Sequence, residues 1–168
     1  MLYDITVPAA IRALTQLHHC LDKAAAHAEA KKFDFTVLLN SRLAPDQFPL
    51  TRQIQIACDT AKLGVSRLTG KDAPVHDDKE ATLAEVKARI ESVITYLKTF
   101  SAADFNGAQA RQVTTPRWEG QWLTTTEYAT LHILPNLYFH VTTAYAILRH
   151  NGVDLGKKDY LGVMPFKK

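Results

Sequence analysis

The chain is 168 residues long, which is the length of one domain and enough to bury a substantial core. Hydrophobic residues make up 46% of it and charged residues 22%, while the formal net charge at pH 7 is only +3. Because the lysines and arginines form no basic stripe and no apolar stretch is long enough to cross a bilayer, we expect neither a nucleic-acid partner nor a membrane partner.

The first half of the chain predicts two long helices, over residues 7–31 and 51–69. In both segments apolar residues recur at steps of three and four, which marks one buried helical face. Gly70 is placed to end the second helix, because glycine adopts a positive φ without a Cβ clash. The connection over residues 33–50 contains prolines that break any long element. Its apolar side chains predict a loop packed against the bundle: Phe35, Leu38, Leu39, Leu43 and Phe48.

A third helix is predicted over residues 78–99. Its apolar stripe runs from Leu83 to Leu97 at helical spacing, opposite a charged outer face, so it is the cleanest amphipathic helix in the chain. Asp77 and Glu80 have the spacing of a capping pattern, which favours a helix start next to them.

The connection after the third helix is not helical in pattern. Residues 112–115 and 120–123 are short β-prone runs joined by a loop, so we predict a small β-ribbon there. Trp118 in the loop and Trp122 in the second run are large apolar side chains. We expect them either to pack on the end of the bundle or to contact another subunit.

The fourth helix is predicted over residues 125–151, where Thr124 and Glu127 form a capping box at its start. Pro135 lies inside this pattern and cannot donate a backbone hydrogen bond to the preceding turn. We therefore expect a kink, or a short helix followed by a longer one that begins beside the proline. The tail over residues 153–166 is rich in apolar residues and should fold back over the bundle.

One stripe of the fourth helix carries the polar groups of greatest chemical interest. His132, Asn136 and His140 are spaced i, i+4 and i+8, so they share one face. On the second helix, Gln55 and Asp59 are also four residues apart. If their flank faces the fourth helix, these two side chains converge on His140; if not, they are surface residues, which is the commoner fate of Gln and Asp.

The two cysteines indicate a reducing compartment. Cys20 and Cys58 fall inside predicted helices and lack C-x-x-C spacing, so we interpret them as buried thiols. The sequence also lacks the basic segment and apolar run of a signal peptide at its N-terminus. Together these observations predict a cytoplasmic protein.

These elements predict an all-α fold, a four-helix bundle with a small β-ribbon between helices 3 and 4, formed as a single domain over residues 1–168. The run from Pro135 to His140, with Ala144–Arg149 and the segment from Gly152 to Gly162, resembles the C-terminal signature of a family with a domain of unknown function. That family is grouped with the DinB/YfiT-like helical bundles, many of which are regarded as metalloenzymes. The resemblance covers nearly the whole chain and implies a DinB-like bundle that often forms homodimers.

The resemblance also implies where a metal ion would lie. In the wider superfamily one His on helix 2 and an H-x-x-x-H pair on helix 4 surround a divalent metal, and three imidazoles suit zinc or nickel. Here Asn136 replaces the first His of the pair, Gln55 stands near the helix 2 position, and His140 alone matches. Because amides are weak ligands for these metals, we predict a degraded site without a tightly held zinc or nickel ion, in which His140 is the remaining metal ligand; His132 and Asp59 are possible substitutes.

Two functions agree with these features. The first is a non-catalytic homodimer that binds a small molecule in a pocket around His140. The second is a metal-dependent thiol transferase or hydrolase with His140 as metal ligand or general base. A third interpretation leaves His140 as a buried imidazole that only stabilises the fold. The predicted pocket residues are His140, Asn136, Gln55, Asp59, Tyr138 and Trp118.

Overall fold

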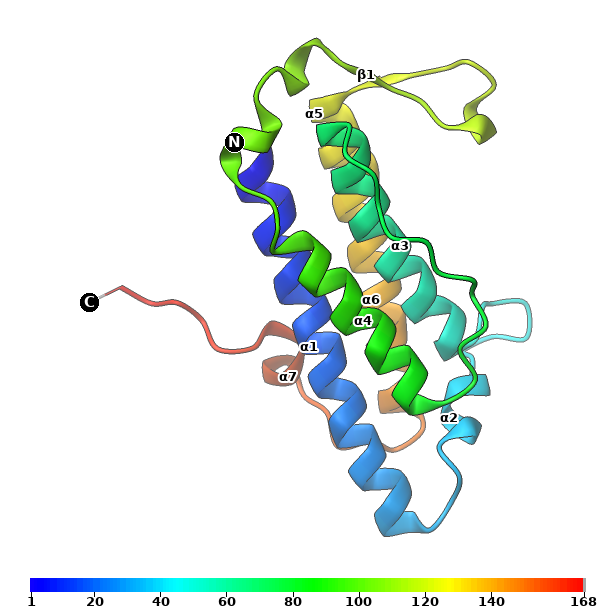
Figure 1. The fold of residues 1–168 in the computed structure, drawn as a ribbon. Coiled ribbons are helices and arrows are strands. Elements are labelled where there is room, and N and C mark those ends of the chain that lie inside the picture. Colours follow the sequence, from blue (N-terminus) through cyan, green and yellow to red (C-terminus); the bar gives the residue numbers. More distant parts are fainter. Residues whose placement is uncertain (168) are drawn as a thin grey trace.

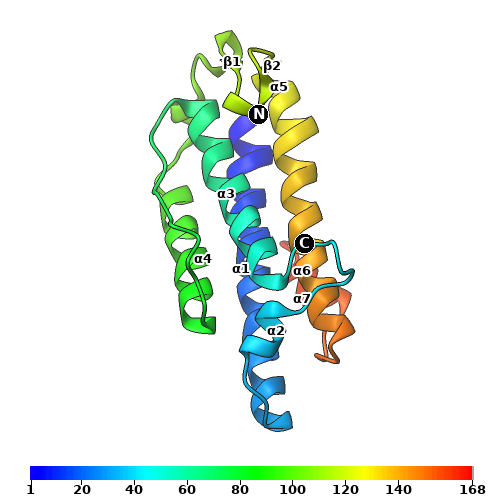
Figure 2. The same ribbon diagram turned by 90° about the vertical axis from the view of Figure 1, so that its right-hand side faces the viewer.

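Four long helices bring their apolar stripes together in one core. The structure, a computed structural model, describes residues 1–167. Its long helices are α1 (Leu2–Lys31), α3 (Leu50–Thr69), α4 (Leu83–Leu97) and α6 (Leu134–His150). Figure 1 shows them side by side, and Figure 2 shows α3 between α4 and α6. The predicted all-α four-helix bundle is therefore confirmed.

The starts of two helices differ from the prediction. Helix α1 begins at Leu2, five residues before the predicted start at residue 7, and Thr6 donates from Oγ1 to the carbonyl oxygen of Leu2 at 2.6 Å. Helix α4 begins at Leu83, because Thr82 and Glu85 form the capping box there. The expected start near residue 78 was wrong, since the acidic residues in that segment bind an arginine of α4 instead.

The connection between α1 and α3 is only partly packed. It contains the short helix α2 (Thr36–Asn40), whose Leu38 and Leu39 are buried. Leu43 is 43% exposed and Phe48 is 55% exposed, so the prediction that these two side chains anchor the loop was wrong. The chain passes them in turns held by backbone hydrogen bonds, which leaves both side chains on the outside.

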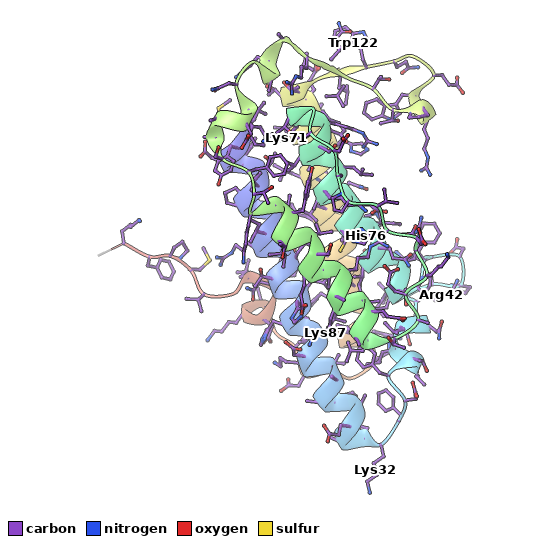
Figure 3. The ribbon with its side chains drawn as sticks, viewed as in Figure 1. Lys32, Arg42, Lys71, His76, Lys87 and Trp122 are labelled. Atoms are coloured by element: carbon purple, nitrogen blue, oxygen red, sulfur yellow. The ribbon has the colours of Figure 1, made fainter. Side chains whose placement is uncertain are left out.

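The β-ribbon forms as predicted, at one end of the bundle. The chain passes through η1 (Ala102–Phe105) and η2 (Ala108–Ala110) into β1 (Gln112–Val113), then through η3 (Pro116–Trp118) into β2 (Leu123–Thr124). The two strands are antiparallel, with Gln112 opposite Thr124. Trp122 is 50% exposed, and Figure 3 shows its side chain pointing away from the bundle.

The proline of the fourth helix changes the helix type instead of simply bending it. The segment consists of α5 (Thr125–Glu127), the π-helical η4 (Tyr128–Ile133) and then α6, in which Pro135 is the second residue. An α-helix would need the missing N–H of Pro135 to reach the carbonyl group of Leu131. The widened turn ends just before that position, so the longer helix begins beside the proline, as one of the two alternatives predicted. Short π-helical segments of this kind often occur at functional sites.

The C-terminal tail folds back only in its first part. Val153 and Leu155 are buried, and α7 (Lys157–Leu161) packs against α1. Val163 is 92% exposed and Phe166 is 87% exposed, so the prediction that the whole tail covers the bundle was wrong. Figure 1 shows this last segment leaving the helices. Within residues 1–167, no helix has the length and apolar character that a membrane crossing requires.

Candidate functional site

A cleft of about 470 Å³ lies between α3, η4 and the loop that joins the two strands. Helix α3 forms one wall with residues that recur at helical spacing, so that Arg52, Ile56, Leu63 and Arg67 share one face. The opposite wall is aromatic and comes from the strand loop and η4. The cleft therefore exists because the ribbon folds over the side of α3 that α4 leaves open.

Three rings form the aromatic wall. Tyr128 and His132 stack with centroids 5.1 Å apart, and Trp118 meets them edge-on at 5.9 and 5.6 Å. Nδ1 of His132 is buried and has no hydrogen-bond partner among residues 1–167. Burial, together with the nearby charge of Arg67, lowers the pKa of His132, so this imidazole is neutral at pH 7. An unpaired polar atom of this kind is uncommon in a folded protein.

The charges along the cleft are unevenly compensated. Arg67 donates from Nη1 to the hydroxyl oxygen of Tyr128 at 2.8 Å. Neither Arg67 nor Arg117, which also lines the cleft, forms an ion pair with any residue that the structure describes. Arg52, at the far end of the α3 wall, is paired with Asp78. Uncompensated positive charge is thus concentrated at the aromatic end of the cleft.

His140 lies behind the cleft and not in it. Its ring is 7% exposed, and Nδ1 donates to Oε1 of Gln53 at 2.7 Å. Gln53 uses its other amide atom as well, donating from Nε2 to the carbonyl oxygen of Phe48 at 3.0 Å. Burial, with a contribution from Arg52, lowers the pKa of His140. Because Phe48 lines the cleft, this buried pair supports one end of its floor.

Asn136 lies one turn before His140 on α6 and likewise lies behind the cleft. Its Nδ2 donates to Oγ1 of Thr60 at 2.7 Å, and Thr60 lines the cleft. Both polar residues therefore face α3, and their partners are residues that the sequence did not single out.

The predicted pocket residues fall into four places. Asp59 and Trp118 line the cleft, and His140 and Asn136 lie behind it. Gln55 is elsewhere, with its amide bonded to Arg52 and Glu80 at 3.0 and 2.8 Å. Tyr138 borders a separate hollow of about 370 Å³ beside α1 and α7.

Asp59 has a second role that the sequence did not reveal. Its Oδ1 accepts from Arg89 at 2.7 Å and forms an ion pair with Lys62 at 3.0 Å, so its charge is already compensated. It stands at the edge between the cleft and the α3–α4 contact. Gln55 and Asp59 therefore do not converge on His140.

Gln53 is the partner of His140 that sequence reasoning missed. A signal was present in the sequence. Ala57, Ala61 and Gly64 are small residues that mark the side of α3 where another helix approaches closely. Gln53 lies one turn before Ala57 on that same side. Gly64 shows how close this approach is, since a Cβ added there would lie 2.9 Å from Cδ1 of Ile133.

The residues around His140 do not fit a zinc or nickel ion. The two neighbouring positions hold amides, and those of Gln53 and Asn136 are engaged in hydrogen bonds with His140 and Thr60. Among residues 1–167, no group of three or more His, Cys, Asp or Glu side chains is arranged to hold a metal. Structural zinc and catalytic zinc sites need three or four such ligands.

Comparison with known proteins agrees with this fold. The family described as a domain of unknown function, DUF1993, matches residues 2–161. The chain belongs to this family. A crystal structure of a DinB family member protein from Shewanella denitrificans is 62% identical in sequence, with a TM-score of 0.97 over 100% of this chain and 96% of that one. No curated protein matches the chain.

Membership of the DUF1993 family brings the DinB-like bundle fold and no assigned activity. What a DUF1993 protein does must therefore be argued from its own groups, because a fold alone does not determine function. In this DUF1993 chain those groups are the cleft, the aromatic wall and the two buried amide pairs behind it.

Proposed function

We propose that this protein binds a small molecule in the cleft between α3, η4 and the strand loop, and that His140 and Asn136 support the cleft from behind. The observation that carries the proposal is the cleft itself. Its volume of about 470 Å³ lies in the range of small-molecule sites. It combines apolar side chains, among them Ile56 and Leu63, with a few polar groups that can orient a ligand.

The proposed role of His140 is structural support and not catalysis. Its one bonded nitrogen orients Gln53, and Gln53 in turn holds the backbone of Phe48 at the edge of the cleft. A metal-dependent transferase or hydrolase would need further ligands beside His140, and the neighbouring amides do not provide them.

The thiols favour the same proposal. Burial raises the pKa of Cys20 to about 11 and that of Cys58 to about 12. Both groups therefore stay protonated at pH 7 and are poor nucleophiles. Buried free thiols are also in keeping with the reducing, cytoplasmic location that we propose.

The proposal can be tested with N-phenyl-1-naphthylamine, an uncharged probe whose fluorescence rises in apolar sites. Leu63→Trp places a larger side chain in the cleft, and Leu43→Trp makes the same change on an exposed leucine that does not line it. We expect the probe to bind the parent and the Leu43→Trp variant equally, and the Leu63→Trp variant at least about tenfold more weakly, a loss of about 1.4 kcal/mol.

Equal binding by all three proteins would overturn the proposal. Circular dichroism and thermal melting show whether Leu63→Trp is folded. Ile56→Trp is the second variant if it is not, because Ile56 also lines the cleft and is only partly buried.

We also propose that the protein forms a homodimer through the outer face of η4 and α6. Between Glu127 and Arg149 the chain contains no Asp, Glu, Lys or Arg. Leu131 is 68% exposed and Phe139 is 55% exposed on this uncharged face. A second copy can pack on it without bringing like charges together, and an exposed apolar face of this kind is typical of an association surface.

The homodimer is tested by light scattering after size-exclusion chromatography. Phe139→Glu puts a charge on the face, and Val75→Glu puts the same charge on a residue that is 88% exposed elsewhere. We expect a dimer for the parent and for Val75→Glu, and a monomer for Phe139→Glu. A monomeric parent at high concentration would contradict the proposal.

A further inference from the structure

Two arginines of the cleft, Arg67 and Arg117, differ from three other cations on α3 and α4. Arg52, Lys62 and Arg89 each have a carboxylate partner, whereas Arg67 and Arg117 have none among residues 1–167. Arg67 is half-buried and is held in place by its hydrogen bond to Tyr128, so its guanidinium group is oriented before any ligand arrives.

An uncompensated guanidinium group in a partly buried cleft is costly unless an anion neutralises it. The nearest acidic residue on the α3 wall of the cleft, Asp59, lies eight residues from Arg67, which is about 12 Å along a helix. Asp59 is also already compensated by Arg89 and Lys62. Among residues 1–167, no carboxylate therefore neutralises the arginine end of the cleft.

The remainder of the cleft is suited to an apolar group. Leu63 lies one turn before Arg67 on the same wall, and Ile56 lies two turns further. Trp118 faces them from the strand loop, next to Arg117. Apolar side chains thus lie directly beside the two arginines and continue along the cleft from them.

We infer that the ligand of this cleft is an organic anion with an apolar body, whose acidic group is bound by Arg67 and Arg117 while its body lies against Leu63, Ile56 and Trp118. A guanidinium group matches planar or tetrahedral acidic groups through paired N–H donors, so the shared chemistry is that of a carboxylate, sulfonate or phosphate. This inference rests on the proposed small-molecule function and adds the chemical class of the ligand.

The test compares two probes that share an apolar body and differ in charge. They are 8-anilinonaphthalene-1-sulfonate and the uncharged N-phenyl-1-naphthylamine. Arg67→Gln removes the oriented charge, and Arg149→Gln removes an exposed charge outside the cleft. We expect Arg67→Gln to weaken binding of the sulfonate about tenfold and to change binding of the uncharged probe by less than about twofold. Arg149→Gln should leave both affinities unchanged.

Arg117→Gln keeps the test decisive if loss of the bond to Tyr128 disturbs the fold of Arg67→Gln. Arg117 is exposed and makes no ion pair with any of residues 1–167, so its replacement should not affect stability, and it should weaken sulfonate binding alone. Because the attraction is electrostatic, added salt should also weaken sulfonate binding to the parent and not binding of the uncharged probe.

The inference and the proposed function fail in different ways. If Leu63→Trp abolishes binding of both probes while both arginine variants bind the sulfonate as the parent does, the cleft is a binding site but not one for anions. If Leu63→Trp leaves both probes bound, the cleft is not the site and the proposed function is overturned as well.

Discussion

Helix α3 packs against α4 on one side and lines the cleft on the other, and its charged groups have different surroundings on the two sides. On the α4 side, Arg89 is 1% exposed and binds Asp59, Asp78 and Glu80 at 2.7, 2.6 and 2.9 Å. On the cleft side, Arg67 has a tyrosine hydroxyl as its partner and no carboxylate among the described residues. Figure 2 shows α3 between α4 and α6.

We interpret this difference in charge compensation as one between a structural role on the α4 side of α3 and the proposed binding role on the cleft side. The Arg89 cluster joins α3, α4 and the connection over residues 70–82, where Figure 3 shows His76 beside α3. Its charges are balanced within the chain, so an added ion has nothing to neutralise. Arg67 and Arg117 in the cleft have no carboxylate partner among residues 1–167, and the anionic ligand that we infer would neutralise them.

The largest loss of stability is expected from Arg89→Met, on the α4 side of α3. The substitution leaves Asp59, Asp78 and Glu80 without their shared cation, and breaking a buried ion pair in this way typically costs about 3–5 kcal/mol. We expect the free energy of unfolding, measured with urea, to fall by about 3 kcal/mol, because Asp78 is 35% exposed and water can solvate it. Arg149→Met, at an exposed position, should change it by less than about 0.5 kcal/mol. A loss below about 1 kcal/mol for Arg89→Met would contradict the structural role.

A smaller loss of unfolding free energy is expected when the hydrogen bond between His140 and Gln53, which lies behind the cleft, is removed. His140→Leu leaves Oε1 of Gln53 without its donor, which should cost about 1–3 kcal/mol of unfolding free energy. The double variant Gln53→Leu with His140→Leu should lose less than the sum of the two single variants, because the two side chains interact directly. Additive losses in urea denaturation would show that the pair is not coupled.

Much of the fold could be predicted from the sequence because it depends on local patterns. The apolar periodicity of α3 and the position of Gly70, whose φ is 77°, place that helix within one residue of its observed bounds. The ribbon and the start of the longer helix beside Pro135 also follow from residues close in sequence.

The site could not be predicted to the same depth, because it depends on how the helices are rotated about their axes. Gln53 and Gln55 are two residues apart, about 200° around the helix axis, so only one of them can face α6. The resemblance places Gln55 there, whereas in the structure Gln53 contacts His140. The start of α4 was misplaced for a related reason. Asp78 and Glu80 bind Arg89, which is 11 and 9 residues away, and a local capping pattern does not reveal such a contact.

The two sides of α3 should also lose stability in different ranges of pH. Burial lowers the pKa of His140 and His132 below 6.5, so the unfolded chain binds more protons and the unfolding free energy falls as the pH drops through 6.5. Burial alone would raise the pKa of Asp78 and Glu80, but hydrogen bonds from Arg89 and its neighbours lower it overall. Their contribution is present at neutral pH and is lost only as the pH falls below about 4.5.

These two ranges can be separated by urea denaturation at several pH values. His140→Leu should show a shallower loss of stability than the parent between pH 7.5 and 5.5. His76 also has a lowered pKa, caused by burial and then by Lys62, so part of the slope should remain. The variant and the parent should show parallel losses below pH 4.5. Identical slopes for the two proteins above pH 5.5 would contradict the assignment to His140.

The smallest effect is expected from added metal. Because the amides of Gln53 and Asn136 occupy the positions beside His140, we expect Zn²⁺ or Ni²⁺ to change the melting temperature of the parent by no more than about 1 °C. Gln53→His with Asn136→His would place three imidazoles there. A metal at 100 times its Kd should then add about 2.7 kcal/mol, or about 5–10 °C. Gln55→His with Asn136→His is the matched control and should not respond, since Gln55 lies in the Arg89 cluster. A parent that is stabilised by metal, with the effect lost in His140→Leu, would show that one imidazole and two amides are sufficient to bind the ion.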